Sequence, residues 1–539
     1  MEFNDKNTAA LIEVIKQQNQ LNTALQKTIE ELNADSKILR EQIDYLTRKL
    51  FGKKSEKTEV ISGQIAFDGV LENGLFNEAE ASADFTEEEF VITKTKRTRK
   101  GYSREKAFEN LLQEDLIYTL SDEEKICSVD GDEIKPVGKK FVRTEIEYTP
   151  ASMKLVHIYK ETWECRSCRK VGRGYLVQGN ANQPLLQHSM ASPSSVAWTM
   201  YQKYVNHIPL YRQEKDWQNL GMEIKRSTLS NWIMKTSEEW LSKVVVTLHK
   251  KLLEEDYLHA DETSVQVLKE EGRKNTTKSY MWLYTTGTHN PYPIRVFDYR
   301  PGRAGVNAAE FLEGYKGFLH TDAYAGYDKV KGITRVLCWS HNRRYYHDAL
   351  PKDLKTAEAT LPRQGIAYCN KLFKIEESLK ELSPEERKEQ RLIQPKPVLE
   401  AYWAWVDSNI NKVLPKSKIG KALQYSQNQQ EGLMAYLKDG NCEISNNLAE
   451  NSIRPFTVGR RNWLFSGSPN GATASAIVYS LVETSKANGL NPYKYLELLL
   501  TRIPKIQTQD EETQIEKLMP WKAEIQELCT NKINRVGDS

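Results

Sequence analysis

Three acidic residues, Asp261, Asp322 and Glu450, have the chemistry needed to hold divalent cations. Asp261 lies in YLHADETSVQVL, Asp322 in GFLHTDAYAGY and Glu450 in NNLAENSIRPF. Carboxylates suit hard, oxygen-seeking ions such as Mg²⁺. Two such ions about 4 Å apart activate a nucleophilic oxygen and stabilise the leaving oxygen of a phosphodiester. A single Asp at a strand end is more often a solvated or capping residue, and spacing alone does not exclude the neighbouring Glu262 and Glu443.

Arginines near these acids are candidates for phosphate binding. Arg454 is one helical turn from Glu450, so the two side chains share a helix face. Basic side chains at such positions bind the phosphate backbone without reading its sequence. The further candidates for phosphate or DNA-backbone contacts are Arg343, Arg344, Arg460 and Arg461.

Cysteines form a second set of candidate ligands. Cys165 and Cys168 make a C-x-x-C, and Cys127 lies upstream with Asp130 where a second C-x-x-C would place its other cysteine. Four thiolates at that spacing close a zinc tetrahedron. With an aspartate in one position, the region is either a zinc site with three cysteines or a metal-free remnant of a zinc ribbon.

A C-x-x-H pair, Cys338 and His341, lies in CWSHNRRYYHDA, with His347 on the same segment. These residues are either a metal site or ordinary core and structural positions. The sequence leaves both interpretations open.

The acids require a fold that brings distant segments together, and residues 246–500 predict one. Alternating β-branched and aromatic segments predict three strands in an antiparallel meander, then a helix near 305–312 and two more strands. That order is typical of a ribonuclease H-like sheet, in which the first and fourth strands are neighbours. Asp261 and Asp322 would then face one site, completed by Glu450 from a helix packed on the sheet. A helical insertion is expected at about 345–440.

Residues 191–245 predict a helix-turn-helix DNA-binding domain. Helices are expected from Pro193 to Tyr204, from Pro209 to Leu220 and from Ser227 to Trp240, with a turn at Gly221. Ser227 or Thr228 is expected to cap the last helix. An ordinary helical hairpin has the same pattern. The expected core residues are Leu229, Trp232 and Ile233, and the expected DNA contacts are Ser227, Thr228, Ser230 and Asn231.

The N-terminal region predicts self-association. Between Leu11 and Leu50 the spacing alternates between four and three residues, and nine of the twelve seam positions are apolar, with Asn22 at an isoleucine-type position. Residues 1–55 are therefore expected to form a parallel coiled-coil dimer, although a long helix packed on its own chain is the alternative. Residues 56–104 read as a charged linker, 105–190 as a degenerate zinc-ribbon-like region and 501–539 as a C-terminal tail.

Composition narrows the class of protein. The 539 residues include 39% hydrophobic and 28% charged side chains, which excludes wholesale disorder. The net charge of +3 indicates little about partners. We expect a cytoplasmic protein without a membrane segment, because no apolar run approaches the length of about 20 residues that spans a bilayer.

The motifs together resemble the insertion-sequence 66 family of DDE transposases. The resemblance covers nearly the whole chain, through LFGKKSEK, HADET, HTDAYAGY, CWSHNRRYYHDA and NNLAENSIRPFTVGRRNWLFSGSPNGA. It implies catalytic Asp261, Asp322 and Glu450 and an N-terminal half that binds terminal inverted repeats. The chain departs from the family at Asp130, where a cysteine is usual, and at Ser445, where an aspartate is common.

The resemblance implies a multidomain α/β enzyme of the bacterial nucleoid that cleaves and transfers DNA strands with Mg²⁺, most simply with two ions. Its partners would be the element ends, target DNA, further copies of the chain and companion proteins encoded by the same element. Two rival interpretations are a DNA-binding protein with a decayed catalytic site and a nuclease acting on RNA strands. The intact set of acids argues against the first, and the coiled coil and helix-turn-helix argue against the second.

Overall fold

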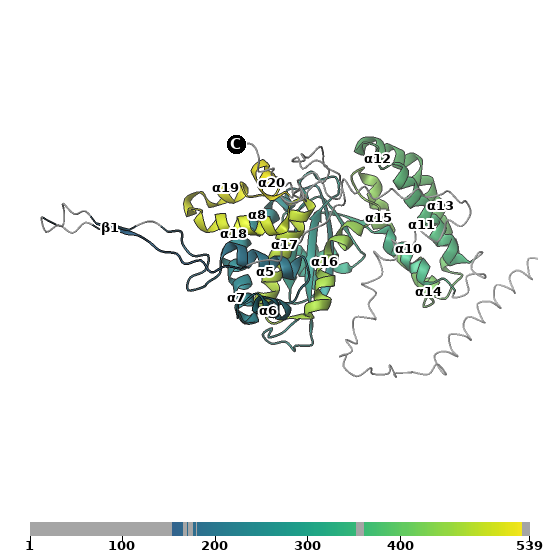
Figure 1. Cartoon of the computed structure of the whole chain (residues 1–539). Coiled ribbons are helices and arrows are strands. Elements are labelled where there is room, and N and C mark those ends of the chain that lie inside the picture. Colours follow the sequence, from purple (N-terminus) through teal and green to yellow (C-terminus); the bar gives the residue numbers. More distant parts are fainter. Residues whose placement is uncertain (1–152, 165–169, 171–175, 179–180, 352–359, 531–539) are drawn as a thin grey trace, which may run out of the picture.

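The computed structural model describes residues 153–164, 170, 176–178, 181–351 and 360–530. The predicted coiled coil, the charged linker and the cysteines Cys127, Cys165 and Cys168 lie outside these residues. A short antiparallel pair, β1 (Thr162–Glu164) and β2 (Leu176–Gln178), projects from the body of the molecule (Figure 1).

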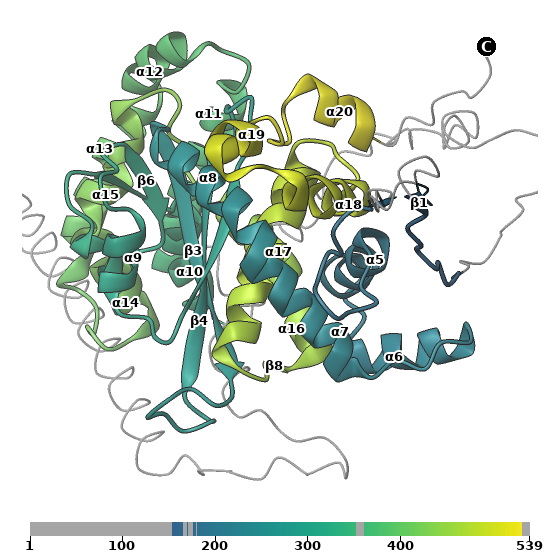
Figure 2. The same ribbon diagram turned by 90° about the vertical axis from the view of Figure 1, so that its left-hand side faces the viewer.

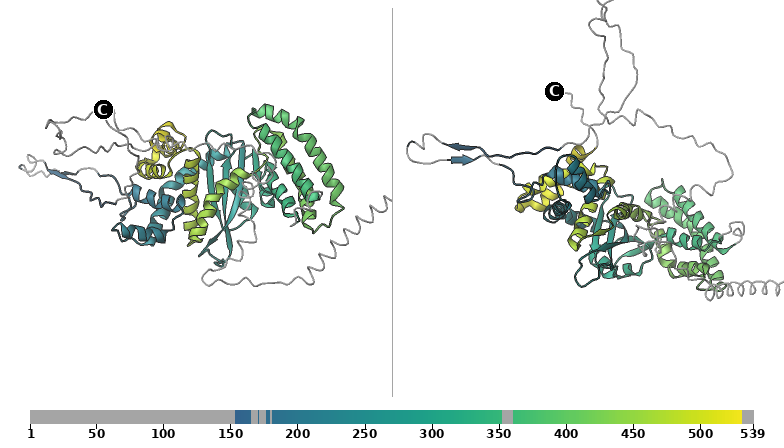
Figure 3. Two further views of the ribbon diagram at one scale, coloured as in Figure 1. Left: turned by 45° about the vertical axis from the view of Figure 1, so that its right-hand side comes forward. Right: turned by 60° about the horizontal axis from the view of Figure 1, so that its bottom comes forward.

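A six-stranded mixed sheet lies at the centre of the fold (Figure 3). Its order is β5-β4-β3-β6-β7, and the short β8 pairs with the far end of β3. The first three strands form the predicted antiparallel meander, and β6 and β7 continue the sheet in parallel with β3. The strands are β3 (Tyr257–Val267), β4 (Lys278–Thr286), β5 (Arg295–Arg300), β6 (Phe318–Thr321), β7 (Thr334–Leu337) and β8 (Phe465–Ser466).

Helices cover both faces of this sheet. On one face Tyr284 stacks on Phe311 of α9 (Gly305–Phe311), and Trp282 packs edge-on against Tyr327 of the 3₁₀ helix η2 (Ala325–Lys329). On the other face α16 (Asn447–Trp463) packs on β3. Its neighbour α17 (Pro469–Ala487) lies beside α16 (Figure 2). It runs along edge strand β5, where hydroxyls of Ser480 and Thr484 bond with the strand backbone. This cover protects an edge that would otherwise pair with another strand.

The helices before the sheet match the predicted helix-turn-helix pattern in order and core. Leu229, Trp232 and Ile233 are buried as expected, and Gly221 has φ of 90°, the left-handed conformation of the turn. The helices are α5 (Pro193–Tyr204), α6 (Leu210–Asn219), α7 (Arg226–Thr236), the π-helical turn η1 (Ser237–Leu241) and α8 (Ser242–Leu253).

The predicted cap of the third helix is wrong. Lys225 occupies the N-cap position of α7, and its side chain makes no capping hydrogen bond. The Glu214 carboxylate on α6 instead accepts the Arg226 backbone N–H at 3.0 Å. A carboxylate from a neighbouring helix therefore satisfies a free helix-start donor, which leaves Ser227 and Thr228 inside the first turn.

The described residues between β7 and α16 are mainly helical, as predicted (Figure 1). They have their own hydrophobic core. Trp339, Tyr346, Tyr402 and Leu423 are among its fully buried residues. Because this core is separate from the one under α16 and α17, the insertion is a second packed unit joined to the sheet. Its helices are α10 (Trp339–Asp348), α11 (Leu361–Ser378), α12 (Pro384–Ile393), α13 (Pro395–Ile410), α14 (Lys418–Asn428) and α15 (Gln430–Met434), followed by the 3₁₀ helix η4 (Ala435–Lys438).

The C-terminal helices pack back on the main core. Ile515, Met519 and Ile525 are buried there, and Lys243 and Lys251 of α8 pair with acids of α19. These elements are α18 (Pro492–Arg502), η5 (Ile503–Lys505), η6 (Thr508–Asp510), α19 (Glu511–Glu516) and α20 (Ala523–Cys529). Among the residues placed by the structure, no helix combines the length and the hydropathy needed to cross a membrane.

Candidate active site

The backbone brings Asp261, Asp322 and Glu450 to one place. Strands β3 and β6 run parallel with His259 opposite His320. Asp261 and Asp322 each come two residues later, on the same face by the alternation of a strand, and Asp322 directly follows the end of β6. Glu450 lies in the first turn of α16, which packs on β3. The sheet and one helix therefore bring together three acids that are far apart in the sequence.

The electrostatics show that these carboxylates form one group. Burial raises the pKa of Asp261 well above its ordinary value, and the charges of Glu262, Glu450 and Asp322 raise it further. Burial also raises the pKa of Glu450, as does Asp322, while His341, Arg344 and Arg454 lower it. Asp322 therefore lies close enough to raise the pKa of both other acids, and Glu450 close enough to raise that of Asp261.

Glu262 lies beside these three acids, but its negative charge is already paired within the protein. It is 4% exposed, and Arg303 binds its carboxylate at 2.6 Å while the Tyr327 hydroxyl donates to it at 2.5 Å. The Arg303 guanidinium also lies 3.9 Å from the Asp322 carboxylate. Neither Arg303 nor Tyr327 stands out in the sequence, and their contacts distinguish Glu262 from the three other acids.

Glu443 makes its contacts with a different set of residues, which includes His259. Its carboxylate accepts the Thr288 hydroxyl at 2.6 Å and lies 3.5 Å from His259. Burial raises the pKa of Glu443, but the charge and hydrogen bond of His259 outweigh it and hold that pKa well below the ordinary value. Glu443 is therefore tied to His259.

His259, His320 and Asn446 form a layer of side chains next to the three acids. His259 and His320 stack with ring centroids 4.1 Å apart. Asn446, the residue before α16, accepts from His259 Nδ1 through its Oδ1 at 2.9 Å and donates from its Nδ2 to the Ala260 carbonyl at 2.9 Å. Asn446 was not singled out from the sequence, although it lies in the motif that carries Glu450. It fixes the start of α16 on β3, one residue from Asp261.

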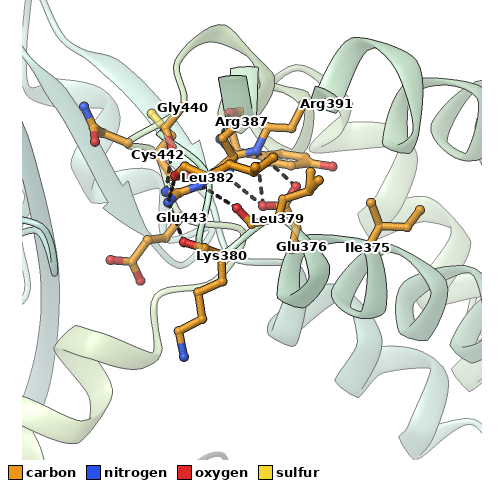
Figure 4. Close-up of polar contacts among 12 residues, drawn as sticks. Ile375, Glu376, Leu379, Lys380, Leu382, Arg387, Arg391, Gly440, Cys442 and Glu443 are labelled. Atoms are coloured by element: carbon orange, nitrogen blue, oxygen red, sulfur yellow. Dashed lines mark hydrogen bonds and ion pairs between the residues drawn. The ribbon is translucent and has the colours of Figure 1, made fainter. Parts of the chain in front are cut away.

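Two buried arginines of α12 hold the loop that leads to α16 (Figure 4). Arg391 pairs with Glu376 at 2.6 Å and donates to the carbonyls of Asp439 and Cys442 at 2.7 and 2.8 Å. Arg387 donates to the Gly440 carbonyl at 3.0 Å. The helical insertion thereby positions the backbone just before the Glu450 helix.

The predicted phosphate-binding arginines divide into distinct environments. Burial raises the pKa of Glu450, and the charges of Arg344 and of the exposed Arg454 both lower it. Arg460 donates to the Thr263 hydroxyl of β3 at 3.1 Å, and burial followed by the charge of Arg461 lowers its pKa to about 10. Arg343 instead lies near Cys369 of the insertion, where burial raises the pKa of the thiol and the charge of Arg343 lowers it. The four predicted DNA contacts of α7 lie outside its core, with Ser227 and Asn231 exposed and Thr228 and Ser230 half-buried.

The predicted C-x-x-H residues meet the acids. Cys338, His341 and Glu450 offer ligand atoms that all lie within 4.8 Å of one another. His347, by contrast, is exposed and is not part of that group.

The carboxylate group concentrates negative charge inside the protein. Its acids repel one another, and the buried Oε1 atom of Glu450 has no hydrogen-bond partner among the described residues. A cation bound by Asp261, Asp322 and Glu450 would relieve both costs. The fold and the site define an α/β protein with a group of neighbouring acids beside basic side chains.

Sequence comparison then gives the family. The profile described as "Transposase IS66 family" matches residues 188–474, more than half of the 539 residues. The chain belongs to the IS66 transposase family, a family of DNA-acting enzymes. Further profiles match in order along the chain: "Transposase C of IS166 homeodomain" over residues 38–116, "zinc-finger binding domain of transposase IS66" over 124–169 and "IS66 C-terminal element" over 480–521. The resemblance inferred from the motifs is confirmed.

Three proteins of Sinorhizobium fredii (strain NBRC 101917 / NGR234) are similar to the chain. The uncharacterized protein y4qI is 30% identical over 365 residues, which cover 65% of this chain and 66% of that protein. The uncharacterized proteins y4hP and y4jD are each 24% identical. The first match covers 89% of this chain and 87% of y4hP, and the second covers 92% of this chain and 96% of y4jD.

Proposed function

We propose that the protein is a DNA transposase that binds the terminal inverted repeats of its mobile element and catalyses metal-dependent strand cleavage and strand transfer. The observation that carries the proposal is the meeting of Asp261, Asp322 and Glu450 on a sheet whose strand order is that of a ribonuclease H-like fold. Membership of a transposase family supports it.

In this proposal Asp261, Asp322 and Glu450 hold two Mg²⁺ ions, which when bound activate the attacking oxygen and stabilise the leaving oxygen. Arg303 compensates Glu262 and keeps its charge from competing for those ions. Arg344, Arg454, Arg460 and Arg461 lie on the two helices beside the acids and bind phosphates of the DNA.

The reaction has two steps on the same strand, a hydrolysis followed by a transesterification. In the first, water attacks the phosphodiester at the element end, the bond between phosphorus and the 3′-oxygen breaks, and that oxygen takes up a proton, which leaves a 3′-hydroxyl and a 5′-phosphate. In the second, that hydroxyl attacks a phosphodiester of the target, and one target 3′-oxygen leaves. Each step breaks one phosphodiester linkage, and the second forms another in its place, so it needs no further energy source.

The N-terminal half supplies recognition and assembly. Helix α7 enters the major groove through Ser227, Thr228, Ser230 and Asn231. Residues 1–55 bring copies of the chain together, and Cys127, Cys165 and Cys168, which lie within the zinc-finger match at 124–169, take part in a zinc site. Companion proteins of the same element act with this chain.

The test is cleavage of the element's own ends by purified protein with Mg²⁺. Asp261→Asn, Asp322→Asn and Glu450→Gln should each lower cleavage and strand transfer more than about 100-fold, beyond the loss expected for an outer-shell partner. Binding to the ends should persist, because the phosphate contacts and the helix-turn-helix do not depend on the carboxylates. The matched controls are the exposed acids Glu313→Gln and Asp348→Asn, which should retain activity.

The outcomes separate the rival functions. Normal cleavage by all three variants would rule out the carboxylate mechanism. A wild-type protein that binds the ends but cuts nothing would be a DNA-binding protein with a decayed site. Cleavage confined to the RNA strand of a hybrid would identify a nuclease instead.

A further inference from the structure

A sulfur, a nitrogen and an oxygen ligand converge where α10 approaches α16. Cys338 precedes α10 and His341 lies in its first turn, so both point to the same side of the helix. The Cys338 Sγ, a His341 ring nitrogen and a Glu450 carboxylate oxygen lie within 4.8 Å of one another. His341 Nδ1 lies 3.9 Å from Glu450 Oε1. This set is chemically distinct from the all-oxygen set of Asp261 and Asp322.

Backbone hydrogen bonds fix these residues relative to one another. The Cys338 N–H donates to the Thr321 carbonyl at 3.2 Å, and the Trp339 N–H donates to the Ile444 carbonyl at 3.0 Å. The Asn446 N–H donates to Cys338 Sγ itself at 3.1 Å. The start of α10 is therefore tied both to the end of β6 and to the residues before α16, and the ligand set is preorganised.

The spacing suits a four-coordinate ion of borderline softness. Zinc bond lengths of about 2.0–2.3 Å at tetrahedral angles separate ligand atoms by roughly 3.5 Å. The three ligand atoms, now within 4.8 Å of one another, need to move by only about 1 Å to reach that separation. Cys338 is 1% exposed, and the Nδ1 atom of His341 and the Oε1 atom of Glu450 are buried, so an ion held there would be largely shielded from solvent.

We propose that Cys338, His341 and Glu450 form a second metal site, which binds one borderline divalent ion such as Zn²⁺ in preference to Mg²⁺. Thiolate and imidazole ligands select zinc-like ions, whereas Mg²⁺ requires oxygen ligands in octahedral geometry. Binding deprotonates the Cys338 thiol and releases that proton to solvent.

The site has a consequence for the proposed function, on which this second part of the inference rests. Glu450 is shared between the two ligand sets. An ion held by Cys338 and His341 turns the Glu450 carboxylate away from Asp261 and Asp322, and the carboxylate group loses one of its ligands. Zinc at this site therefore inhibits Mg²⁺-dependent cleavage.

The binding test uses Co²⁺ as a spectroscopic probe on the full chain carrying Cys165→Ser and Cys168→Ser, so that the other cysteine group is removed. We expect thiolate-to-cobalt absorption that saturates at one ion per chain. Cys338→Ser should abolish this absorption, and Glu450→Gln should weaken Co²⁺ binding at least tenfold. Cys369→Ser is the matched control, because Cys369 is also a buried cysteine but belongs to the insertion core, and it should leave the absorption unchanged.

Absorption that is absent, or that persists in Cys338→Ser, overturns the proposal and leaves Cys338 and His341 as structural partners of Glu450. The inhibition test adds Zn²⁺ to the Mg²⁺ cleavage assay of the wild-type chain, and Cys338→Ser, which lacks the proposed site, should lose the inhibition. Cobalt binding without inhibition by zinc keeps the site and rejects the sharing of Glu450. A chain that never cleaves DNA, yet binds cobalt as expected, disproves the proposed function and not the site.

Discussion

At the scale of single residues, the carboxylate group opposes the folding of the metal-free protein. Burial and the neighbouring acids raise the pKa of Asp261 well above its ordinary value. A raised folded-state pKa stabilises the fold at pH below the unfolded pKa, and this stabilisation is lost as the pH rises through the folded pKa. At neutral pH, Asp261, Asp322 and Glu450 therefore repel one another unless a cation is bound. Strain of this kind is typical of sites selected for activity rather than stability.

The first prediction concerns Asp261→Asn without metal. Removing one of the crowded charges should raise the melting temperature at pH 7.5 by about 2–4 °C, the change expected for roughly 1 kcal/mol in a large domain. The gain should shrink towards pH 4, where the wild-type acid is protonated. Thermal denaturation in EDTA at both pH values measures it. Mg²⁺ should then stabilise the wild type more than the variant.

A variant that is less stable than the wild type at both pH values would show that Asp261 has a structural role. The control is Asp348→Asn, which removes an exposed acid from the end of α10 and should not change the pH dependence.

At the scale of elements, the position of α16 depends on the helical insertion as well as on the sheet. Arg391 of α12 is 2% exposed and binds both Glu376 and the loop carbonyls at Asp439 and Cys442. The loop then passes Asn446, which is anchored on β3. The insertion is therefore part of the scaffold that carries Glu450.

The second prediction is that Arg391→Met lowers the free energy of unfolding by about 3–5 kcal/mol, the usual cost of leaving one member of a buried ion pair unpaired. Urea denaturation measures this loss. Lys388→Met, on the exposed side of the same helix, should change it by no more than about 0.5 kcal/mol. Combining Arg391→Met with Glu376→Leu should recover part of the loss. A loss below about 1 kcal/mol in Arg391→Met would contradict the bracing role.

The sequence alone was sufficient to predict those elements whose pattern depends on residues close together in the chain. Strict alternation predicted the meander of β3, β4 and β5, and apolar spacing predicted the buried Leu229, Trp232 and Ile233 of α7. The N-cap of α7 was missed because its partner, Glu214, lies on another helix. Arg303, Arg391 and Asn446 were missed for the same reason. Each acts through contacts between segments far apart in the chain, which periodicity does not encode.

The third prediction concerns α7 as a DNA-reading helix. Asn231 is exposed, while the adjacent Trp232 is 4% exposed and packs against Trp217. Asn231→Ala should weaken binding to the element ends by about 1–3 kcal/mol if its amide contacts a base edge, and it should not change the melting temperature. Binding to unrelated DNA should be nearly unaffected, because phosphate contacts carry it. Fluorescence anisotropy with both DNAs measures the difference. Equal losses on both DNAs would show that Asn231 does not read sequence.

At the scale of the whole molecule, separate units are joined around one site. The main core includes α5 to α8, the central strands, α17 and the C-terminal helices, and the insertion has a second core. The proposed recognition by α7 and the proposed chemistry on β3 would therefore share one packed body. The ion pairs between α8 and α19 close that body at its C-terminal side. A transposase that acts on two element ends needs, in addition, a means of bringing two such bodies together.

The fourth prediction is that residues 1–55 supply this means. Their seam places Ile15, Ile29 and Ile43 at one register position and mostly leucines at the other, with Asn22 among the isoleucine-type positions, a pattern that favours a parallel dimer. The full chain should have at least the mass of a dimer in light scattering, and a chain lacking residues 1–55 should be a monomer that still responds to Mg²⁺ in thermal denaturation. Asn22→Leu removes the polar residue that selects the dimer, so higher oligomers should appear. The matched change Gln18→Leu, at a leucine-type position, should leave the dimer intact. Because the metal response reports on the folded site independently of assembly, a truncated chain that remains dimeric and responds to Mg²⁺ would place the interface elsewhere in the protein.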